Sequence, residues 1–154
     1  MERCNKIYNY PLYRSAAEHI KRTEKDRAFC LHDIDHSLDV ARIAYILSLE
    51  NNLGIEREII YAAALMHDIG RYTGKPHNAK SAEMAYKILP ECGFSESEVN
   101  IIADAVDNHR SDTARTDLGK IIHKADRLSR KCYECDAAKE CYWTDARRNH
   151  KISY

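Results

Sequence analysis

The stretch that decides the fold of this chain is Ala62-Ala63-Ala64-Leu65-Met66-His67-Asp68-Ile69-Gly70. It starts as an apolar run and ends on two adjacent side chains, His67 and Asp68, that can each ligate a metal. Burying an imidazole and a carboxylate at a helix end costs free energy unless each has a partner. A divalent cation serves both at once, so the pair predicts a metal site. The pair alone decides little, because a second His-Asp pair stands at His32-Asp33.

Helical periodicity runs along most of the chain, with only five glycines and three prolines to interrupt it. We therefore predict an all-α fold, a single compact multi-helix bundle with a metal site in its core. One helix should begin near Pro11 and another should end at Gly70. A capping box of Ser95 and Glu98 should open a further helix. The other expected helices cover residues 36–50, 79–89 and 118–126.

Five titratable residues continue the apolar stripes of these helices: His36, His67, Asp68, His109 and Asp126. A single buried histidine is usually a hydrogen-bonded structural residue. Five such groups on four helices would need five separate explanations, whereas one shared metal centre accounts for all of them. Helical bundles can bring such groups together in their cores.

Charge and composition limit the classes of function. The chain has 24 basic and 24 acidic residues, and this balance argues against a broad surface for nucleic acid or for an anionic membrane. No apolar stretch approaches the roughly 20 residues of a membrane span. The first residues contain no apolar signal region, so we expect a cytoplasmic protein. The sequence does not indicate the oligomeric state.

Three strings with metal-capable residues occur in a fixed order: His36-Ser37-Leu38-Asp39-Val40-Ala41-Arg42-Ile43-Ala44, Ala64-Leu65-Met66-His67-Asp68-Ile69-Gly70-Arg71 and Lys124-Ala125-Asp126-Arg127-Leu128-Ser129. In order and helical setting they resemble the motif blocks of the HD-domain superfamily of metal-dependent phosphohydrolases. The resemblance covers residues 32–130. It implies an HD-type helical domain over residues 1–131, followed by a cysteine-containing tail over residues 132–154.

The resemblance implies that His36, His67, Asp68 and Asp126 bind one metal ion, with Asp68 as the catalytic residue. Family members with two ions place further histidines in positions similar to two found here. In that arrangement Asp68 would bridge the ions, and the second ion would be held by the histidines His77 and His109. One ion and two ions both remain open.

The two additional histidines give the nearest likeness to the branch that contains diadenosine tetraphosphate hydrolases. The chain is less similar to the cyclic-dinucleotide phosphodiesterases. Arg71 stands where that branch has lysine, and Asn108 followed by His109 stands where it has paired histidines. The likeness therefore argues against a cyclic dinucleotide as substrate.

Imidazole and carboxylate ligands suit Mn, Fe, Co, Ni or Zn better than calcium. A bound cation lowers the pKa of its water from about 15.7 toward about 7, which makes hydroxide available for attack on phosphorus. The expected function is hydrolysis of a phosphate ester or anhydride in a small molecule, most simply a nucleotide. A di-iron oxygenase of the same fold and a non-catalytic metal- or nucleotide-binding module are the alternatives.

Basic residues close to the expected ligands are candidates for contacting the substrate phosphate. Lys124 and Arg127 flank Asp126 in the sequence, and the other candidates are Arg71, Lys80 and Arg110. Each could equally be a solvated surface cation.

Two histidines form rival pairs with the expected ligands. His32 lies four residues before His36, a spacing that would place both on one helix face. A helix cap at Asp33 or Asp35 would instead leave His32 outside the helix, at the entrance of the site. His123 lies three residues before Asp126 and has a similar standing.

The C-terminal part carries Cys132, Cys135 and Cys141 in a Cys-x2-Cys-x5-Cys pattern. With a fourth ligand, these thiolates could form a second metal site, for zinc or an iron–sulfur cluster. Free cysteines on a C-terminal segment are the alternative. The sequence leaves the fourth ligand open among Cys4, Cys30, Cys92 and His150.

Overall fold

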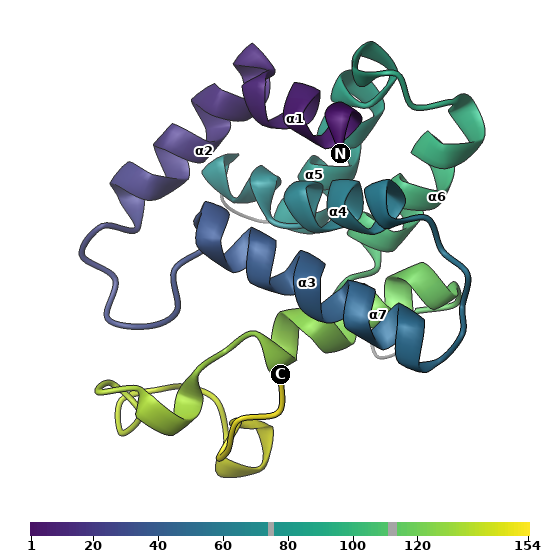
Figure 1. The fold of residues 1–154 in the computed structure, drawn as a ribbon. Coiled ribbons are helices and arrows are strands. Elements are labelled where there is room, and N and C mark those ends of the chain that lie inside the picture. The colour runs from purple at the N-terminus through teal and green to yellow at the C-terminus, as the bar shows by residue number, and fades with distance from the viewer. Residues whose placement is uncertain (74–75, 111–113) are drawn as a thin grey trace.

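The computed structural model describes residues 1–73, 76–110 and 114–154 of the chain. Over these ranges the secondary structure is helical and includes no strand (Figure 1). The α-helices are α1 (Glu2–Asn9), α2 (Pro11–Thr23), α3 (Ile34–Glu50), α4 (Arg57–Met66), α5 (His77–Ile88), α6 (Glu96–Asp107) and α7 (Asp117–Leu128). The short 3-10 helices are η1 (Ile69–Thr73), η2 (Pro90–Cys92), η3 (Cys132–Glu134) and η4 (Asp145–Arg147). The all-α prediction is confirmed.

The core lies where α3, α4, α6 and α7 meet. Figure 1 shows α3 and α4 running side by side through the middle of the molecule, and α3 also packs on α7. Val40, Ile60, Ile102 and Ile122, one from each of these helices, are fully buried. They lie on the apolar stripes that the helical periodicity predicts. The ends of these helices therefore meet around the same central space.

Two predicted helix starts are confirmed at the level of hydrogen bonds. The Asp33 carboxylate accepts a hydrogen bond of 3.0 Å from the backbone N–H of His36, so α3 begins after Asp33 and His32 lies outside it. Ser95 and Glu98 form the expected reciprocal capping box at the start of α6.

The end of α4 differs from the sequence-based prediction. The helix stops at Met66, and His67 and Asp68 lie in the turn that leads into η1. Gly70 does not terminate a helix. A Cβ at this position would collide with the backbone oxygen of His77 and would lie 2.5 Å from the backbone nitrogen of Ser81. The missing side chain instead lets η1 approach the first turn of α5, where the N–H of Gly70 donates to Ser81 Oγ at 2.8 Å.

Helix α1 was not predicted, because it has only eight residues and its apolar stripe is limited to Cys4, Ile7 and Tyr8. It is held by charge as well as by burial. Arg3 donates to Glu58 Oε2 on α4 and to Glu98 Oε1 on α6, both at 2.8 Å. One guanidinium thus ties α1 to two helices of the core, while Ile7 buries the apolar side of α1.

The segment after α7 has a different character. Every residue from 131 to 154 is at least partly exposed. The segment returns to the end of α7, where the Asn149 side chain donates to the backbone oxygens of Arg127 and Arg130, each at 2.8 Å. Among the described residues, no helix is long and apolar enough to span a membrane.

Candidate metal centre

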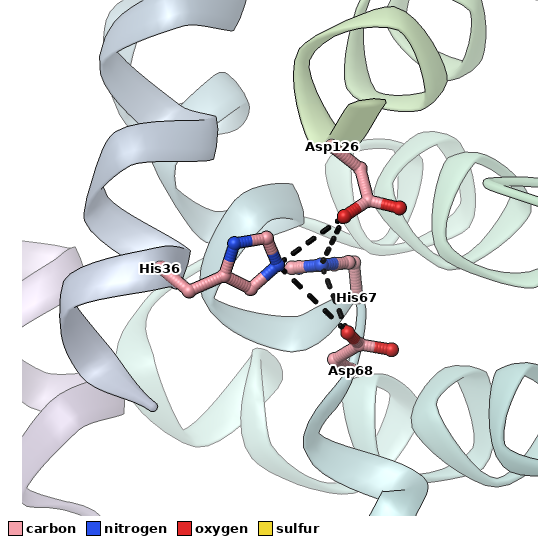
Figure 2. Close-up of side chains that lie close together, drawn as sticks. All are labelled: His36, His67, Asp68 and Asp126. Carbon is pink, nitrogen blue, oxygen red and sulfur yellow. Dashed lines mark ion pairs between the residues drawn. The ribbon is translucent and has the colours of Figure 1, made fainter. Parts of the chain in front are cut away.

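Four predicted residues from three parts of the chain converge in the core: His36 at the start of α3, His67 and Asp68 after α4, and Asp126 on α7 (Figure 2). One ligand atom from each lies within 4.8 Å of the other three. His36 Nε2 is 3.2 Å from Asp126 Oδ1, and His67 Nε2 is 3.4 Å from Asp68 Oδ2. Ligands bonded at about 2.0–2.2 Å to one ion lie about 3 Å or slightly more from one another. The four atoms are therefore close to the spacing of a coordination shell.

A second group shares Asp68 with the first. Asp68, His77 and His109 also present ligand atoms that all lie within 4.8 Å of one another. His77 Nε2 is 3.1 Å and His109 Nε2 is 3.7 Å from Asp68 Oδ1, whereas the first group uses Asp68 Oδ2. The two carboxylate oxygens of one aspartate thus face two different sets of histidines.

The hydrogen bonds of the imidazoles show whether a metal would fit. Carbonyl oxygens can only accept, so the Nδ1 of His67 must donate to Ala64 O at 2.6 Å, and the Nδ1 of His109 must donate to Val106 O at 2.5 Å. Nε2 is then the nitrogen of each ring that could ligate a metal, and both Nε2 atoms face Asp68. The buried Nε2 atoms of His67 and His77 make no hydrogen bond. A metal ion would give these two nitrogens a partner.

Burial and charge oppose each other at the site. Burial lowers the pKa of His36 and of His109 to about 4, which keeps both rings in the neutral, metal-binding form near pH 7. Burial also acts to lower the pKa of His67, but the negative charges of Asp68 and Asp126 outweigh it and raise that pKa. Burial alone would raise the pKa of Asp68, yet the charge on His67 holds it well below its usual value. A ligating metal would have to displace the proton from His67.

Arg130 joins the site although the sequence analysis did not single it out. Its Nη2 atom is 2.8 Å from Asp126 Oδ1 and 3.1 Å from His36 Nε2, and the side chain is buried. Because a guanidinium can only donate, His36 Nε2 must be the accepting nitrogen. The sequence signal was available, since Arg130 follows Asp126 by four residues, one helical turn.

Glu24 is a second residue that sequence reasoning missed, and no local pattern pointed to it. It lies just beyond α2 and accepts from His32 Nδ1 at 2.9 Å and from Arg71 Nε at 3.2 Å. His32 Nε2 then comes within 3.7 Å of Asp68 Oδ2. Glu24 therefore orients His32 and Arg71 at the edge of the site.

The predicted phosphate-binding residues divide into two kinds. Arg71 approaches the cluster, with Nη1 3.8 Å from Asp68 Oδ1. Lys80 forms a surface ion pair of 2.7 Å with Glu83 on its own helix. Lys124 and Arg127 are exposed, and helical geometry turns them away from the face that carries Asp126.

The remaining histidine and cysteine predictions can be placed as well. The Nδ1 of His123 donates to the backbone oxygen of His109 at 2.7 Å, which supports the turn that carries His109. Cys132, Cys135 and Cys141 lie outside both His/Asp groups. They line a cavity of about 490 Å³ that extends to His36.

Comparison with known proteins agrees with this geometry. The family model of the HD domain matches residues 31–131, which include all six His and Asp residues of the two groups. This chain belongs to the HD-domain family. The crystal structure of a predicted HD superfamily hydrolase from an uncultured Thermotogales bacterium has a TM-score of 0.63 and 29% sequence identity. The match covers 92% of this chain and 81% of that one.

Relatives found by sequence are of two kinds. An uncharacterised protein of Clostridium beijerinckii is 40% identical over the full length of both chains. Bifunctional uridylyltransferase/uridylyl-removing enzymes match over shorter stretches. The enzyme of Cereibacter sphaeroides is 33% identical over 57% of this chain. The enzyme of Rhodospirillum rubrum is 38% identical over 39% of this chain. The matched stretches make up only 9% of the first enzyme and 6% of the second.

Proposed function

We propose that this HD-domain protein is a metal-dependent phosphohydrolase that cleaves a phosphate ester or anhydride of a nucleotide. The observation that carries the proposal is the arrangement around Asp68, whose two oxygens face separate groups of buried imidazole nitrogens. Two ions that share a carboxylate can hold both the attacking and the leaving oxygen of a displacement at phosphorus.

In the proposed assignment, His36, His67, Asp68 and Asp126 hold one ion, and Asp68, His77 and His109 hold a second. When bound, such ions lower the pKa of a coordinated water toward about 7 and neutralise charge on phosphate oxygens. The chain itself fixes the ligands. The backbone acceptors Ala64 O and Val106 O hold the rings of His67 and His109 with Nε2 pointing inward.

We assign the binding of substrate phosphate to Arg130 and Arg71. Each has donor atoms beside one of the shared carboxylates, Arg130 at Asp126 and Arg71 near Asp68. An arginine fork matches the geometry of phosphate oxygens, and both guanidiniums stay charged at any working pH. If His36 Nε2 ligated a metal, it would no longer accept from Arg130, and the Arg130 guanidinium would be available for a substrate oxygen.

A cavity of about 470 Å³ next to Asp68 has the size of a site for a small molecule. Asp68 and His32 line it, together with three cations, Arg14, Lys21 and Lys25, and two aromatic rings, Tyr8 and Tyr13. Four further carboxylates also line it: Glu18, Glu24, Asp33 and Asp35. Cations suit the remaining phosphates of a nucleotide, and aromatic rings suit its base. We assign the substrate to this cavity, which we call the α2 cavity.

The relatives support the choice of a nucleotide-like substrate. Some carry the name of uridylyl-removing enzymes, and removal of a uridylyl group breaks a bond to a nucleotide phosphate. The proposed reaction is of the same chemical kind, with a substrate small enough for the α2 cavity.

The test is phosphate release from a panel of nucleoside mono-, di- and triphosphates, dinucleoside polyphosphates and a chromogenic phosphodiester. Protein loaded with Mn²⁺, Co²⁺, Ni²⁺ or Fe²⁺ should turn over at least one of them, under argon as well as in air. Turnover that requires oxygen would instead identify an oxygenase, and tight binding without turnover would identify a sensor.

Variants make the same test specific to the site. Asp68→Ala should lose both ions and all measurable turnover, whereas His77→Ala should lose one ion and keep the other, as measured by elemental analysis. Asp68→Ala protein that keeps its full metal content and its turnover contradicts the assignment.

A further inference from the structure

The cavity of about 490 Å³ beside His36 is lined by four of the six cysteines of the chain: Cys30, Cys132, Cys135 and Cys141. We name it the cysteine cavity. Cys30 comes from the loop before α3, and the other three come from the segment that follows α7. Residues about 100 positions apart in sequence thus contribute thiols to one space. No disulfide joins them.

The structure removes the other candidates for a fourth ligand. The thiol of Cys4 donates to the backbone oxygen of Glu58 beneath α1, and Cys92 is buried in η2. The Nε2 atom of His150 lies against Asp145 O at 2.8 Å on the exposed side of the segment. None of these three residues lines the cysteine cavity. Cys30 does, and it completes a set of four thiols.

We infer that Cys30, Cys132, Cys135 and Cys141 form a second metal site, a four-thiolate centre for a zinc ion or an iron–sulfur cluster. Four thiolates are the ligand set of both structural zinc and iron–sulfur clusters. The centre is separate from the His/Asp groups and would cross-link the C-terminal segment to the loop before α3.

The first physical reason is stability. Residues 131–154 include no buried side chain, so this segment has no core of its own. Short segments that follow a defined path without a core usually depend on a metal or on disulfides. The contacts that do hold it are few, such as the edge-to-face packing of Tyr142 on Phe29 at 6.2 Å. A metal held by Cys30 and the segment would fix it at the same place.

The second reason is charge. Four thiolates around a divalent ion leave a net negative charge, which needs cations nearby. Four cations line the cysteine cavity, Arg27, Arg130, Lys131 and Arg148, against three carboxylates, Asp33, Asp39 and Glu134. The Nε atoms of Arg27 and Arg148 are buried and have no hydrogen-bond partner in the described part of the chain. Thiolate or cluster sulfurs would accept from these donors.

The distances between the sulfur atoms determine what metal binding would require. Within the described ranges, no set of three or more ligand atoms that lie within 4.8 Å of one another includes a cysteine sulfur. A zinc ion with bonds of about 2.3 Å would hold its four sulfurs about 3.8 Å apart. The segment must therefore close around a single ion, or the thiolates must be bridged by a cluster with several irons.

The experiment uses the full chain, purified without oxygen, and measures zinc, iron and acid-labile sulfide. Because the His/Asp groups also bind metal in the proposed function, the measurement is made on Asp68→Ala protein as well as on the wild type. The four-thiolate centre should keep its metal in Asp68→Ala protein. Loss of that metal would therefore contradict the four-thiolate centre without bearing on the phosphohydrolase proposal. Bound zinc without sulfide identifies the ion, and iron with sulfide and visible absorption identifies the cluster.

Cysteine variants assign the ligands. In the Asp68→Ala background, Cys30→Ser and Cys141→Ser should each lose the remaining metal, and trypsin should then cleave after Lys139 or Lys151 far faster than in the parent. Cys92→Ala is the matched control and should keep the metal. Circular dichroism checks that the helical core is still folded. Three outcomes would overturn the inference. They are a metal-free protein with six reactive thiols, a disulfide among the four cysteines, and Cys30→Ser protein with an undiminished metal content.

Discussion

The guanidinium of Arg130 lies between Asp126 and His36, both of which we assign to the same ion. Burial acts to lower the pKa of Arg130, but the carboxylate of Asp126 outweighs it and raises that pKa. The cation therefore persists inside the protein and offsets the charge of the carboxylates. In the proposed function, Arg130 would be available to an anionic substrate once His36 binds a metal.

Substitution of Arg130 by Gln should lower kcat by about 10²–10³-fold, the usual loss when one preorganised charged donor is removed from a developing anion. Metal content should stay close to that of the wild type, because Arg130 is not a ligand. Steady-state kinetics and elemental analysis on the same sample test both statements.

Arg127→Gln is the informative comparison, since the sequence pointed to Arg127 and the structure places it on an exposed face of α7. We expect its kcat to change by less than about threefold, in line with the small effect of an exposed charge. A larger loss for Arg127→Gln than for Arg130→Gln would restore the sequence-based assignment.

Single residues also show which parts of the site can be predicted from the sequence. His36, His67, Asp68 and Asp126 could be singled out because each extends an apolar helical stripe, and a stripe predicts burial. Glu24 could not, because its closeness to Arg71 arises from how α2 packs on η1, and no local periodicity records that packing.

At the scale of elements, the contact of η1 with α5 sets the distance between Asp68 and His77. Gly70 allows this contact because it has no side chain to collide with the first turn of α5. The sequence indicated a glycine stop, which is the commoner role of glycine after a helix. The true role depends on a neighbouring helix and was not readable from the local sequence.

Gly70→Ala should destabilise the protein by about 1–3 kcal/mol through overpacking and should weaken the ion assigned to His77 and His109. Denaturant unfolding and elemental analysis provide the two measurements. Gly119→Ala is the control, because an added Cβ there meets nothing closer than Thr116 Oγ1 at 3.1 Å and gains helix propensity. We expect its stability to stay within about 1 kcal/mol of the wild type. Equal effects of the two substitutions would contradict the close-packing role of Gly70.

The docking of α1 on α4 should depend on acid. The amino group of Met1 and the guanidinium of Arg3 bind Glu58 and lower its pKa to about 2. A carboxyl with a depressed pKa in the folded state stabilises the fold fully above its unfolded pKa of about 4.5. That contribution is lost as the pH falls from there through about 2.

Glu58→Gln should therefore lower the free energy of unfolding by about 1–3 kcal/mol at pH 7, the range for hydrogen bonds to charged groups. The difference from the wild type should shrink between about pH 4.5 and pH 2. Urea unfolding at several pH values measures it. Glu2→Gln, which affects only an exposed pair with Lys6, should shift stability by less than about 0.5 kcal/mol. A Glu58 effect that does not vary with pH would show that the ion pairs are not its source.

At the scale of the whole molecule, the helices enclose a cluster of candidate metal ligands that come from α3, α5, α7 and the turns after α4 and α6. An ion there would cross-link most of the bundle. Any ligand that binds only the folded state stabilises it by mass action, by about 2.7 kcal/mol at a concentration of 100 times its Kd.

Saturating Mn²⁺, which has little affinity for thiolates, should thus raise the melting temperature of the metal-stripped protein by about 5–10 °C, given about 2–4 °C per kcal/mol for a domain of this size. Differential scanning calorimetry measures the shift, and Asp68→Ala should remove it. Identical melting curves with and without metal, at concentrations that support turnover, would argue that the ions do not join the helices.

The two oxygens of Asp68 point toward different histidine pairs, and this division has a consequence for the order of filling. The first ion to arrive would fix the plane of the carboxylate and leave the second oxygen already aimed at its own pair of rings. Part of the orientational entropy of the second binding event would then be lost in advance, so occupancy should rise cooperatively with metal concentration.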